Sequence, residues 1–181
     1  MMKDFAMHVL DIAQNSISAG AKLIELEIIE DTEKNIFCFT IRDDGCGMDA
    51  EMVNQVRSPF TTSRTTRKVG LGIPMLDQTC QLCGGSLAIE SEPGKGTKLC
   101  ALMRLDSIDL PPLGDIADIV HMLIVTNEAL DFVYTHALGE NHFSLDTHEI
   151  KQVLEGVPLS EPSVMGWLKE TIAEGLAGLK K

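Results

Sequence analysis

The chain has 181 residues, a formal net charge of −12 and a hydrophobic content of 44%. Such a composition supports a packed core and excludes an intrinsically disordered protein. The acidity and an aromatic content of 4% argue against binding to nucleic acids or to anionic membranes. No apolar run approaches the roughly 20 residues that a membrane-spanning helix needs.

The N-terminal segment Met1–Asp11 has neither a basic leader nor a small-residue cleavage site, so we expect no export signal. The five cysteines are odd in number and are scattered through apolar segments. This distribution is typical of reduced thiols rather than of a disulfide framework. The sequence therefore predicts a cytoplasmic protein.

Residues 1–104 alternate between helical and strand patterns. Apolar residues at helical spacing predict a helix over Asp4–Ala19 that Gly20 ends. β-branched residues predict a hairpin of two strands, Leu23–Ile29 and Ile36–Ile41. The expected elements that follow are a helix over Ala50–Val56, a loop over Ser58–Val69, a helix over Gly70–Leu82 and strands over Leu87–Ile89 and Lys98–Met103. Tight connections between consecutive strands predict an α+β fold, a two-layer sandwich of helices on a mostly antiparallel sheet.

The paired prolines in Ser107–Gly114 predict a boundary between residues 104 and 105, because they can continue neither a helix nor a central strand. The net charge is −3 over residues 1–104 and −9 over residues 105–181. The second part is expected to be an acidic, mainly helical region, with Trp167 facing the core and a partner anchor as the alternative for this side chain. Its predicted helices are Asp115–Ala137, Glu149–Leu154 after a cap at Asp146 or Thr147, and Glu161–Leu179 after a cap at Ser160.

Asp11 and Asn15 lie four residues apart and share one face of the first predicted helix. A carboxylate and a carboxamide placed in this way can hold a water and a Mg²⁺ ion, which prefers hard oxygen ligands. A helix cap or a hydrogen bond in the core is the alternative interpretation of this pair.

The second predicted strand ends in Asp43-Asp44-Gly45-Cys46-Gly47. A carboxylate at a strand end beside a glycine turn can select an exocyclic amine such as that of adenine, because it only accepts hydrogen bonds. An ordinary strand-to-helix turn is the alternative.

The segment Ser58–Lys68 gathers three basic and six hydroxyl side chains, and Gly70-Leu71-Gly72 opens the next helix. Backbone N–H groups at a helix start favour an anion, so this segment is suited to cradle a triphosphate. A solvated surface loop or a docking patch is the alternative, and the pattern of a Walker-type loop is absent. In Gly84–Thr97, a Pro-Gly-x-Gly turn is structural by default, and Thr97 is a candidate ligand contact.

In this order and spacing, the four motifs resemble the ATP-binding fold shared by gyrase, heat-shock-ninety chaperones, histidine kinases and mismatch-repair ATPases, the GHKL or Bergerat family. The resemblance covers roughly Asp4–Arg104. The segment Asp11–Ala21 is similar to the mismatch-repair and gyrase form of the N box. The more kinase-like segments are Ser58–Ser63, Val69–Ile73 and Gly84–Thr97.

The resemblance implies a site for Mg·ATP in which Asn15 binds Mg²⁺ and Asp43 reads the adenine amine. Asp11 stands where the hydrolytic relatives carry a glutamate that orients the attacking water, which makes it the candidate catalytic base. Thr97 would support the adenine site. The remaining implied nucleotide contacts are Thr62, Arg64 and Lys68 in the lid and Gly45, Gly47, Gly70, Leu71 and Gly72 along the backbone.

The resemblance also implies a function. We expect a stand-alone kinase or ATPase switch, comparable to the anti-sigma serine kinases, that phosphorylates or gates a regulatory or substrate protein docked on residues 105–181. The alternative is a non-catalytic module that senses ATP. A mismatch-repair or topoisomerase clamp is disfavoured, because a transducer domain is lacking and the acidity suits DNA poorly.

The cysteine pair and the histidines are not expected to carry chemistry. Cys80 and Cys83 form one CxxC pair without a second pair at ligand spacing, so we expect buried cysteines rather than a metal or redox site. His8 shares a helix face with Asn15 and is expected to pack or cap, with contact to the site as the alternative. No histidine has the His-Glu-x-x-x-Pro context of a kinase phosphoacceptor, so autophosphorylation is not expected.

Overall fold

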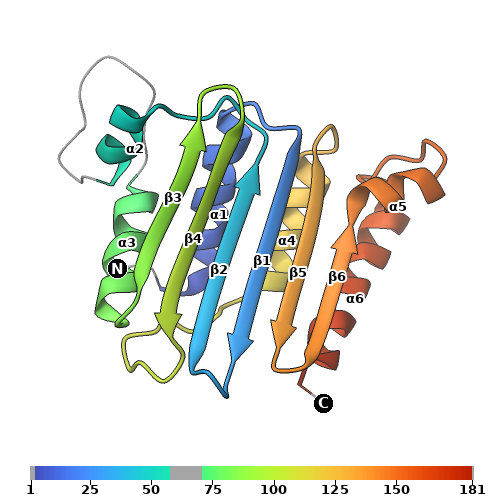
Figure 1. The fold of residues 1–181 in the computed structure, drawn as a ribbon. Helices are drawn as coiled ribbons and strands as arrows, with labels where there is room; N and C mark the ends of the chain where they lie inside the picture. The colour runs from blue at the N-terminus through green and yellow to red at the C-terminus, as the bar shows by residue number, and fades with distance from the viewer. Residues whose placement is uncertain (1–2, 58–70, 181) are drawn as a thin grey trace.

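The described residues form a six-stranded sheet with their helices on one face (Figure 1). The computed structural model describes residues 3–57 and 71–180. The elements of the first part are α1 (Phe5–Ser18), β1 (Leu23–Asp31), β2 (Ile36–Asp43), α2 (Ala50–Val56), α3 (Gly72–Leu82), β3 (Ser86–Glu92) and β4 (Gly96–Arg104). Those of the second part are α4 (Ile116–Thr126), β5 (Asp131–Leu138), β6 (Asn141–Asp146), α5 (Thr147–Val153) and α6 (Pro162–Gly178).

The strands lie in the order β3-β4-β2-β1-β5-β6. All neighbouring strands pair antiparallel except β1 and β5, which are parallel. Strand residues alternate between a face that packs on the helices and a face that the described helices leave uncovered (Figure 1). The predicted α+β class, with helices over a mostly antiparallel sheet, is confirmed.

The first helix begins and ends as the sequence predicts. The side chain of Asp4 caps α1 by accepting a hydrogen bond from the backbone N–H of Met7 at 3.2 Å. Gly20 follows the helix with a φ of +75°, a conformation that glycine adopts without strain. The fully buried ring of Phe5 packs edge-on against Phe37 and Phe39 of β2, which fixes α1 on the middle of the sheet.

The predicted helix over Asp115–Ala137 is wrong beyond Thr126. The side chain of Asn127 donates a hydrogen bond to the carbonyl oxygen of Leu123 at 2.8 Å, and α4 ends there. From Asp131 the burial alternates with a period of two, because every second residue faces the core of the sheet. Residues 105–181 therefore supply two strands to the same sheet as well as helices, and the boundary at residues 104 and 105 stays a prediction.

The last two helices match their predicted places with two corrections. Asp146 caps α5 by accepting from the N–H of His148 at 2.8 Å, as predicted. The cap of α6 is Glu161 and not Ser160. Trp167 does not face the core, because its side chain is 49% exposed, whereas its neighbour Leu168 is fully buried.

Candidate functional site

Asp43 ends β2 with its carboxylate almost fully buried, at 8% exposure. Its Oδ2 accepts a hydrogen bond from the Ser16 hydroxyl at 2.6 Å, and its Oδ1 accepts one from the Gly45 N–H at 2.9 Å. Each carboxylate oxygen can accept two hydrogen bonds, so both oxygens retain acceptor capacity for a ligand amine. The carboxylate therefore lies at a strand end beside a glycine turn, where the sequence predicts it.

The turn after Asp43 is tied to the elements on both sides. The Oδ1 atom of Asp44 accepts hydrogen bonds from the N–H groups of Lys22 at 2.7 Å and Leu23 at 2.9 Å. Burial alone would raise the pKa of Asp44, but the N–H donors of Leu23 and Lys22 outweigh it and hold the pKa below its usual value. The N–H of Cys46 donates to the carbonyl oxygen of Ala19 at 3.0 Å. These bonds fix the end of β2 against the end of α1 and the start of β1.

Glycines allow the β3–β4 turn to pack closely against the turn that follows Asp43. A Cβ atom on Gly47 (φ +66°) would overlap the carbonyl oxygen of Glu92, and one on Gly96 (φ +87°) would overlap that of Asp43. A Cβ on Gly45 would lie 2.9 Å from Asp43 Oδ1. The structure thus gives Gly45 and Gly47 a packing role that is independent of any nucleotide.

Thr97 of β4 lies directly opposite Asp43 in the β2–β4 register. Its Oγ1 is 2.9 Å from the Oγ of Ser91, which donates its single proton to the carbonyl oxygen of Gly96. Thr97 therefore donates to Ser91, and its own oxygen stays an acceptor beside Asp43. Ser91 also accepts from the N–H of Met48 at 2.8 Å, which links the two turns.

Asp11 and Asn15 are both half-buried, one helical turn apart on α1. Asn15 directly precedes Ser16, the donor to Asp43. A Cβ atom on Gly72 would lie 3.1 Å from Asp11 Cβ and 3.2 Å from Asp11 Oδ2, so the first turn of α3 contacts Asp11. α1 therefore connects two places: Ser16 near its end bonds to Asp43, and Asp11, five residues earlier, contacts Gly72 of α3.

No side chain within residues 3–57 and 71–180 caps the first turn of α3. Its N-cap is Leu71, which offers no side-chain acceptor to the first N–H groups of the helix. Such N–H groups and the helix dipole favour a negative charge. Leu71 is itself 58% exposed.

The donor set of Asp11 and Asn15 fits a magnesium ion that is bound mainly by a ligand. In residues 3–57 and 71–180, no three His, Cys, Asp or Glu side chains lie close enough to hold a metal ion. A carboxylate and an amide oxygen suit Mg²⁺, which commonly completes its octahedron with phosphate oxygens and water. The residues present thus fit a metal that enters together with a nucleotide.

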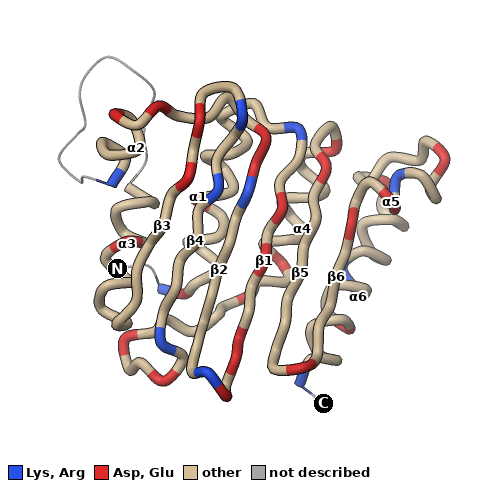
Figure 2. Tube along the Cα trace, viewed as in Figure 1, with Lys and Arg blue, Asp and Glu red and all other residues tan. Residues whose placement is uncertain are grey.

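Cationic side chains described at this end of the sheet already form ion pairs with carboxylates. Figure 2 shows Lys and Arg next to Asp and Glu at the ends of β4, β2 and β1 that carry the site. Arg42 pairs with Glu25 at 3.7 Å and Lys95 with Glu92 at 2.8 Å. A triphosphate would therefore need further donors, and the predicted ones, Thr62, Arg64, Lys68 and Gly70, lie outside the described residues.

His8 and the CxxC pair contribute packing to the neighbouring α1–α3 interface. His8 is fully buried, with Nε2 3.4 Å from Thr79 Oγ1, and burial lowers its pKa to about 4, so the ring is neutral near pH 7. Cys80 and Cys83 are buried as expected, and burial raises the pKa of Cys80 to about 12. His8 bonds to Thr79, whereas Asp43 bonds to Ser16, so among the described residues His8 shares no hydrogen bond with the Asp43 site.

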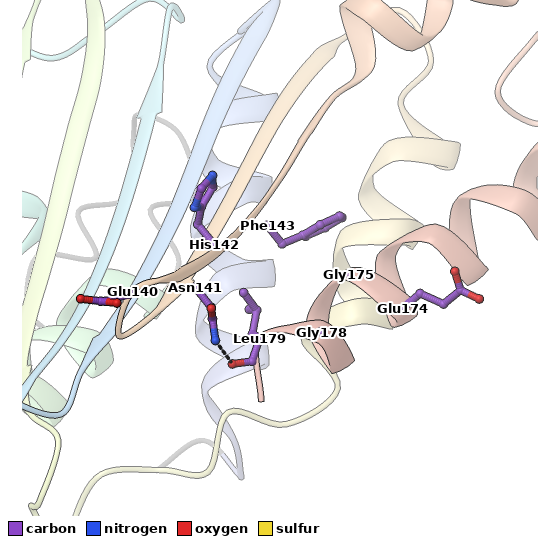
Figure 3. A pocket seen from close by; sticks show the side chains of 8 residues that line it. All are labelled: Glu140, Asn141, His142, Phe143, Glu174, Gly175, Gly178 and Leu179. Atoms are coloured by element: carbon purple, nitrogen blue, oxygen red, sulfur yellow. Dashed lines mark hydrogen bonds between the residues drawn. The ribbon is translucent and has the colours of Figure 1, made fainter. Parts of the chain in front are cut away.

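A hollow of about 460 Å³ lies at the opposite end of the sheet, between the β5–β6 turn and α6 (Figure 3). Phe143 and Leu179 give it an apolar side, and Glu140 and Glu174 flank it. Two carboxylates disfavour a triphosphate there, so the end with Asp43 remains the candidate nucleotide site.

Sequence reasoning missed Ser16 and Ser91. Ser16 follows the Asp11–Asn15 pair on the buried side of α1, a position where a hydroxyl needs a partner. Ser91 lies opposite Thr97 across the β3–β4 hairpin. The pairing of the predicted strands could have indicated Ser91, but nothing in the sequence alone pairs Ser16 with Asp43.

The described residues form an α+β sandwich with a buried carboxylate beside a glycine turn at one end of its sheet. Residues 3–107 match the model of the histidine kinase-, DNA gyrase B- and HSP90-like ATPase family. The chain belongs to this family, which implies ATP as its ligand.

Curated relatives are signalling kinases and sensors. The chain is 30% identical over 98 residues to sporulation kinase C of Bacillus subtilis (strain 168), which covers 54% of this chain and 23% of the kinase. It is 28% identical over 103 residues to a putative sensor protein of Shewanella frigidimarina (strain NCIMB 400), covering 56% of this chain and 16% of that protein. The match therefore spans less than a quarter of the length of either relative.

Solved structures show the same fold over more of the chain. The Aquifex aeolicus MutL ATPase domain complexed with ADP has a TM-score of 0.51 at 15% identity, covering 86% of this chain and 70% of that chain. The N-terminal domain of a DNA repair protein has a TM-score of 0.54 at 14% identity, covering 80% and 52%. This likeness extends past residue 107 and so includes part of the second region. Within residues 3–57 and 71–180, no helix has the length and apolarity to cross a bilayer.

Proposed function

We propose that the chain binds Mg·ATP at the Asp43 end of the sheet and acts as a stand-alone protein kinase or ATPase switch that regulates a partner protein. The observation that carries this proposal is the hydrogen bond of 2.6 Å between Ser16 and Asp43. It joins the carboxylate that would read the base to the residue next to Asn15, the amide that would hold the metal. The kinase and sensor relatives support a role in signalling.

The site would recognise the nucleotide base through hydrogen-bond acceptors. Asp43 keeps acceptor capacity on both oxygens, and Thr97 keeps an acceptor oxygen beside it. The exocyclic amine of adenine supplies two N–H donors, whereas a 6-oxo purine presents an acceptor at that position. The site should therefore prefer ATP to a 6-oxo purine nucleotide.

The phosphates would lie between α1 and α3. Mg²⁺ would neutralise phosphate charge, with Asn15 and Asp11 supplying oxygen atoms. The first turn of α3, which no side chain of the described residues caps, would add N–H donors. Thr62, Arg64, Lys68 and Gly70 are proposed as the remaining phosphate contacts.

Asp11 is the proposed catalytic residue. Its carboxylate contacts Gly72 at the start of α3, so it would lie beside the transferring phosphoryl group. There it would accept a proton from the attacking water or protein hydroxyl. An aspartate reaches one methylene less than the glutamate of the hydrolytic relatives, so the nucleophile must approach α1 closely.

Residues 105–181 are proposed to dock the partner. The N–H of Asp131 at the start of β5 donates to the carbonyl oxygen of Lys22 at 2.8 Å. The N–H of Lys22 donates in turn to Asp44, next to Asp43. A partner that moved β5 would therefore act on the nucleotide site through two hydrogen bonds.

The alternative function is ATP sensing without turnover, and the exchange Asp11→Asn separates the two. We expect the wild-type chain to release ADP slowly in a Mg²⁺-dependent assay, with and without candidate partners. Asp11→Asn should keep ATP binding and lose that release, while the exposed neighbour exchange Gln14→Ala should change neither. Equal release by wild type and Asp11→Asn would refute the catalytic role and leave the sensor.

A further inference from the structure

The uncovered face of the sheet carries a pair of thiols that the nucleotide site does not use. Cys38 of β2 and Cys100 of β4 alternate with buried core residues, so both side chains lie on the face opposite the helices. In Figure 1 this face is toward the viewer, and none of the described helices crosses it. The two Sγ atoms are 3.7 Å apart, in hydrogen-bond contact.

We propose that Cys38 and Cys100 form a redox modification site, at which a low-molecular-weight disulfide oxidises the pair to a cross-strand disulfide. Both side chains are partly exposed, so a small disulfide can reach them from solvent. By contrast, Cys80 and Cys83 are buried under the helix layer. The pair on the uncovered face is therefore the one that a soluble reagent can oxidise.

The strand register places the two cysteines diagonally. Cys38 lies opposite Leu102, and Cys100 lies opposite Thr40. Cα atoms at diagonal positions are about 7–8 Å apart, at or above the separation of about 7 Å beyond which a disulfide requires backbone movement. Closing the bond must draw β2 and β4 together, and a strained disulfide of this kind is readily reduced again.

The thiol–disulfide exchange proceeds in two steps. Burial, as the larger cause, and the neighbouring Cys100, as the smaller one, raise the pKa of Cys38 to about 11. Cys38 therefore keeps its proton near pH 7 and can donate a hydrogen bond to the Cys100 sulfur. The Cys100 thiolate attacks one sulfur of the small disulfide and displaces a thiolate, which leaves a mixed disulfide. Cys38 then loses its proton and attacks the Cys100 sulfur, which displaces the second thiolate. The pair loses two electrons, and the small disulfide becomes two thiols that take up both protein protons.

The modification would act on the nucleotide site, a step that rests on the proposed function. β2 ends at Asp43, and the partner of Asp43 on β4 is Thr97. A bond between Cys38 and Cys100 would shift these two strands relative to each other a few residues away. We therefore expect the oxidised chain to bind ATP less tightly than the reduced one.

The test uses the full chain with Cys46→Ser, which removes an exposed thiol that could link two molecules. The protein is equilibrated with oxidised glutathione, alkylated and digested, and the peptides are analysed by mass spectrometry. We expect a cross-linked peptide pair that lacks two hydrogen atoms, that dithiothreitol reverses, and that Cys38→Ser and Cys100→Ser each abolish. Full alkylation of Cys38 and Cys100 after this treatment would overturn the proposal.

Two further measurements complete the test. Circular dichroism of the oxidised chain should match that of the reduced chain, since a cross-link formed only in unfolded protein would also overturn the proposal. The rise in melting temperature with Mg·ATP should be smaller after oxidation, and an equal rise would refute the coupling to the nucleotide site. The cross-link is detected without ATP. A chain that binds Mg·ATP but forms no cross-link would therefore refute the redox site alone, and a chain that forms the cross-link but binds no ATP would refute the proposed function alone.

Discussion

The exchange Asp43→Asn tests how the site reads a base. The variant keeps the shape of the side chain but replaces one of its two carboxylate oxygens, which accept from Ser16 and Gly45, by an NH₂ group. Because this NH₂ group can only donate, it opposes the amine of adenine. A lost hydrogen bond to a charged acceptor costs about 1.5–3 kcal/mol, which corresponds to a loss in ATP affinity of roughly 10- to 150-fold.

The same exchange should favour a base with an acceptor at the amine position. We therefore expect Asp43→Asn to bind inosine triphosphate at least as well as ATP, whereas the wild type prefers ATP. Isothermal titration of both nucleotides, with Mg²⁺, measures the two ratios. Asp44→Asn is the matched control, because Asp44 is engaged by the N–H groups of Lys22 and Leu23 and should leave the preference unchanged. If Asp43→Asn keeps the wild-type preference for ATP, the assignment of Asp43 to the base is refuted.

Two other predictions concern stability. Gly96→Ala should lower the free energy of unfolding by about 2–4 kcal/mol in urea titrations, because its Cβ would overlap Asp43 O. Gly94→Ala, with a similar φ of +78° and nothing within 4 Å, should cost about 1–2 kcal/mol, and equal losses would contradict the packing argument. Since the pKa of His8 falls from 6.5 to about 4 on folding, the unfolded chain binds more protons between these values. Stability should therefore drop by about 3 kcal/mol from pH 6.5 to 4, and a His8→Gln variant that keeps the whole drop would argue against this origin.

The sequence predicts the first part of the fold well, because its elements carry clean periodicities and stops. The hairpin of β1 and β2 and the helix α1 before Gly20 follow directly from them. The second part of the fold is less predictable, because Val133 fits a helical stripe continued from α4 as well as a strand. In the structure α4 ends at Thr126, where the Asn127 side chain donates to Leu123, and Val133 lies in β5.

The candidate site is predictable in part. Asp43 ends β2 and Asp11 and Asn15 lie one turn apart on α1, as the motifs predict, whereas their roles toward a nucleotide stay predictions. The donor Ser16 was not foreseen, because a pairing between α1 and the end of β2 depends on how the helix packs. The roles of the lid residues Thr62, Arg64, Lys68 and Gly70 stay predictions, since these residues lie outside the described part of the chain.

The most direct test of the account is calorimetric titration of Mg·ATP into the wild-type chain, Asn15→Ala and the matched control Gln14→Ala. The account predicts saturable, Mg²⁺-dependent binding to the wild type and to Gln14→Ala, with binding lost or no longer dependent on Mg²⁺ in Asn15→Ala. Unchanged Mg²⁺-dependent binding by Asn15→Ala would contradict the claim that α1 holds the metal of a nucleotide whose base rests on Asp43.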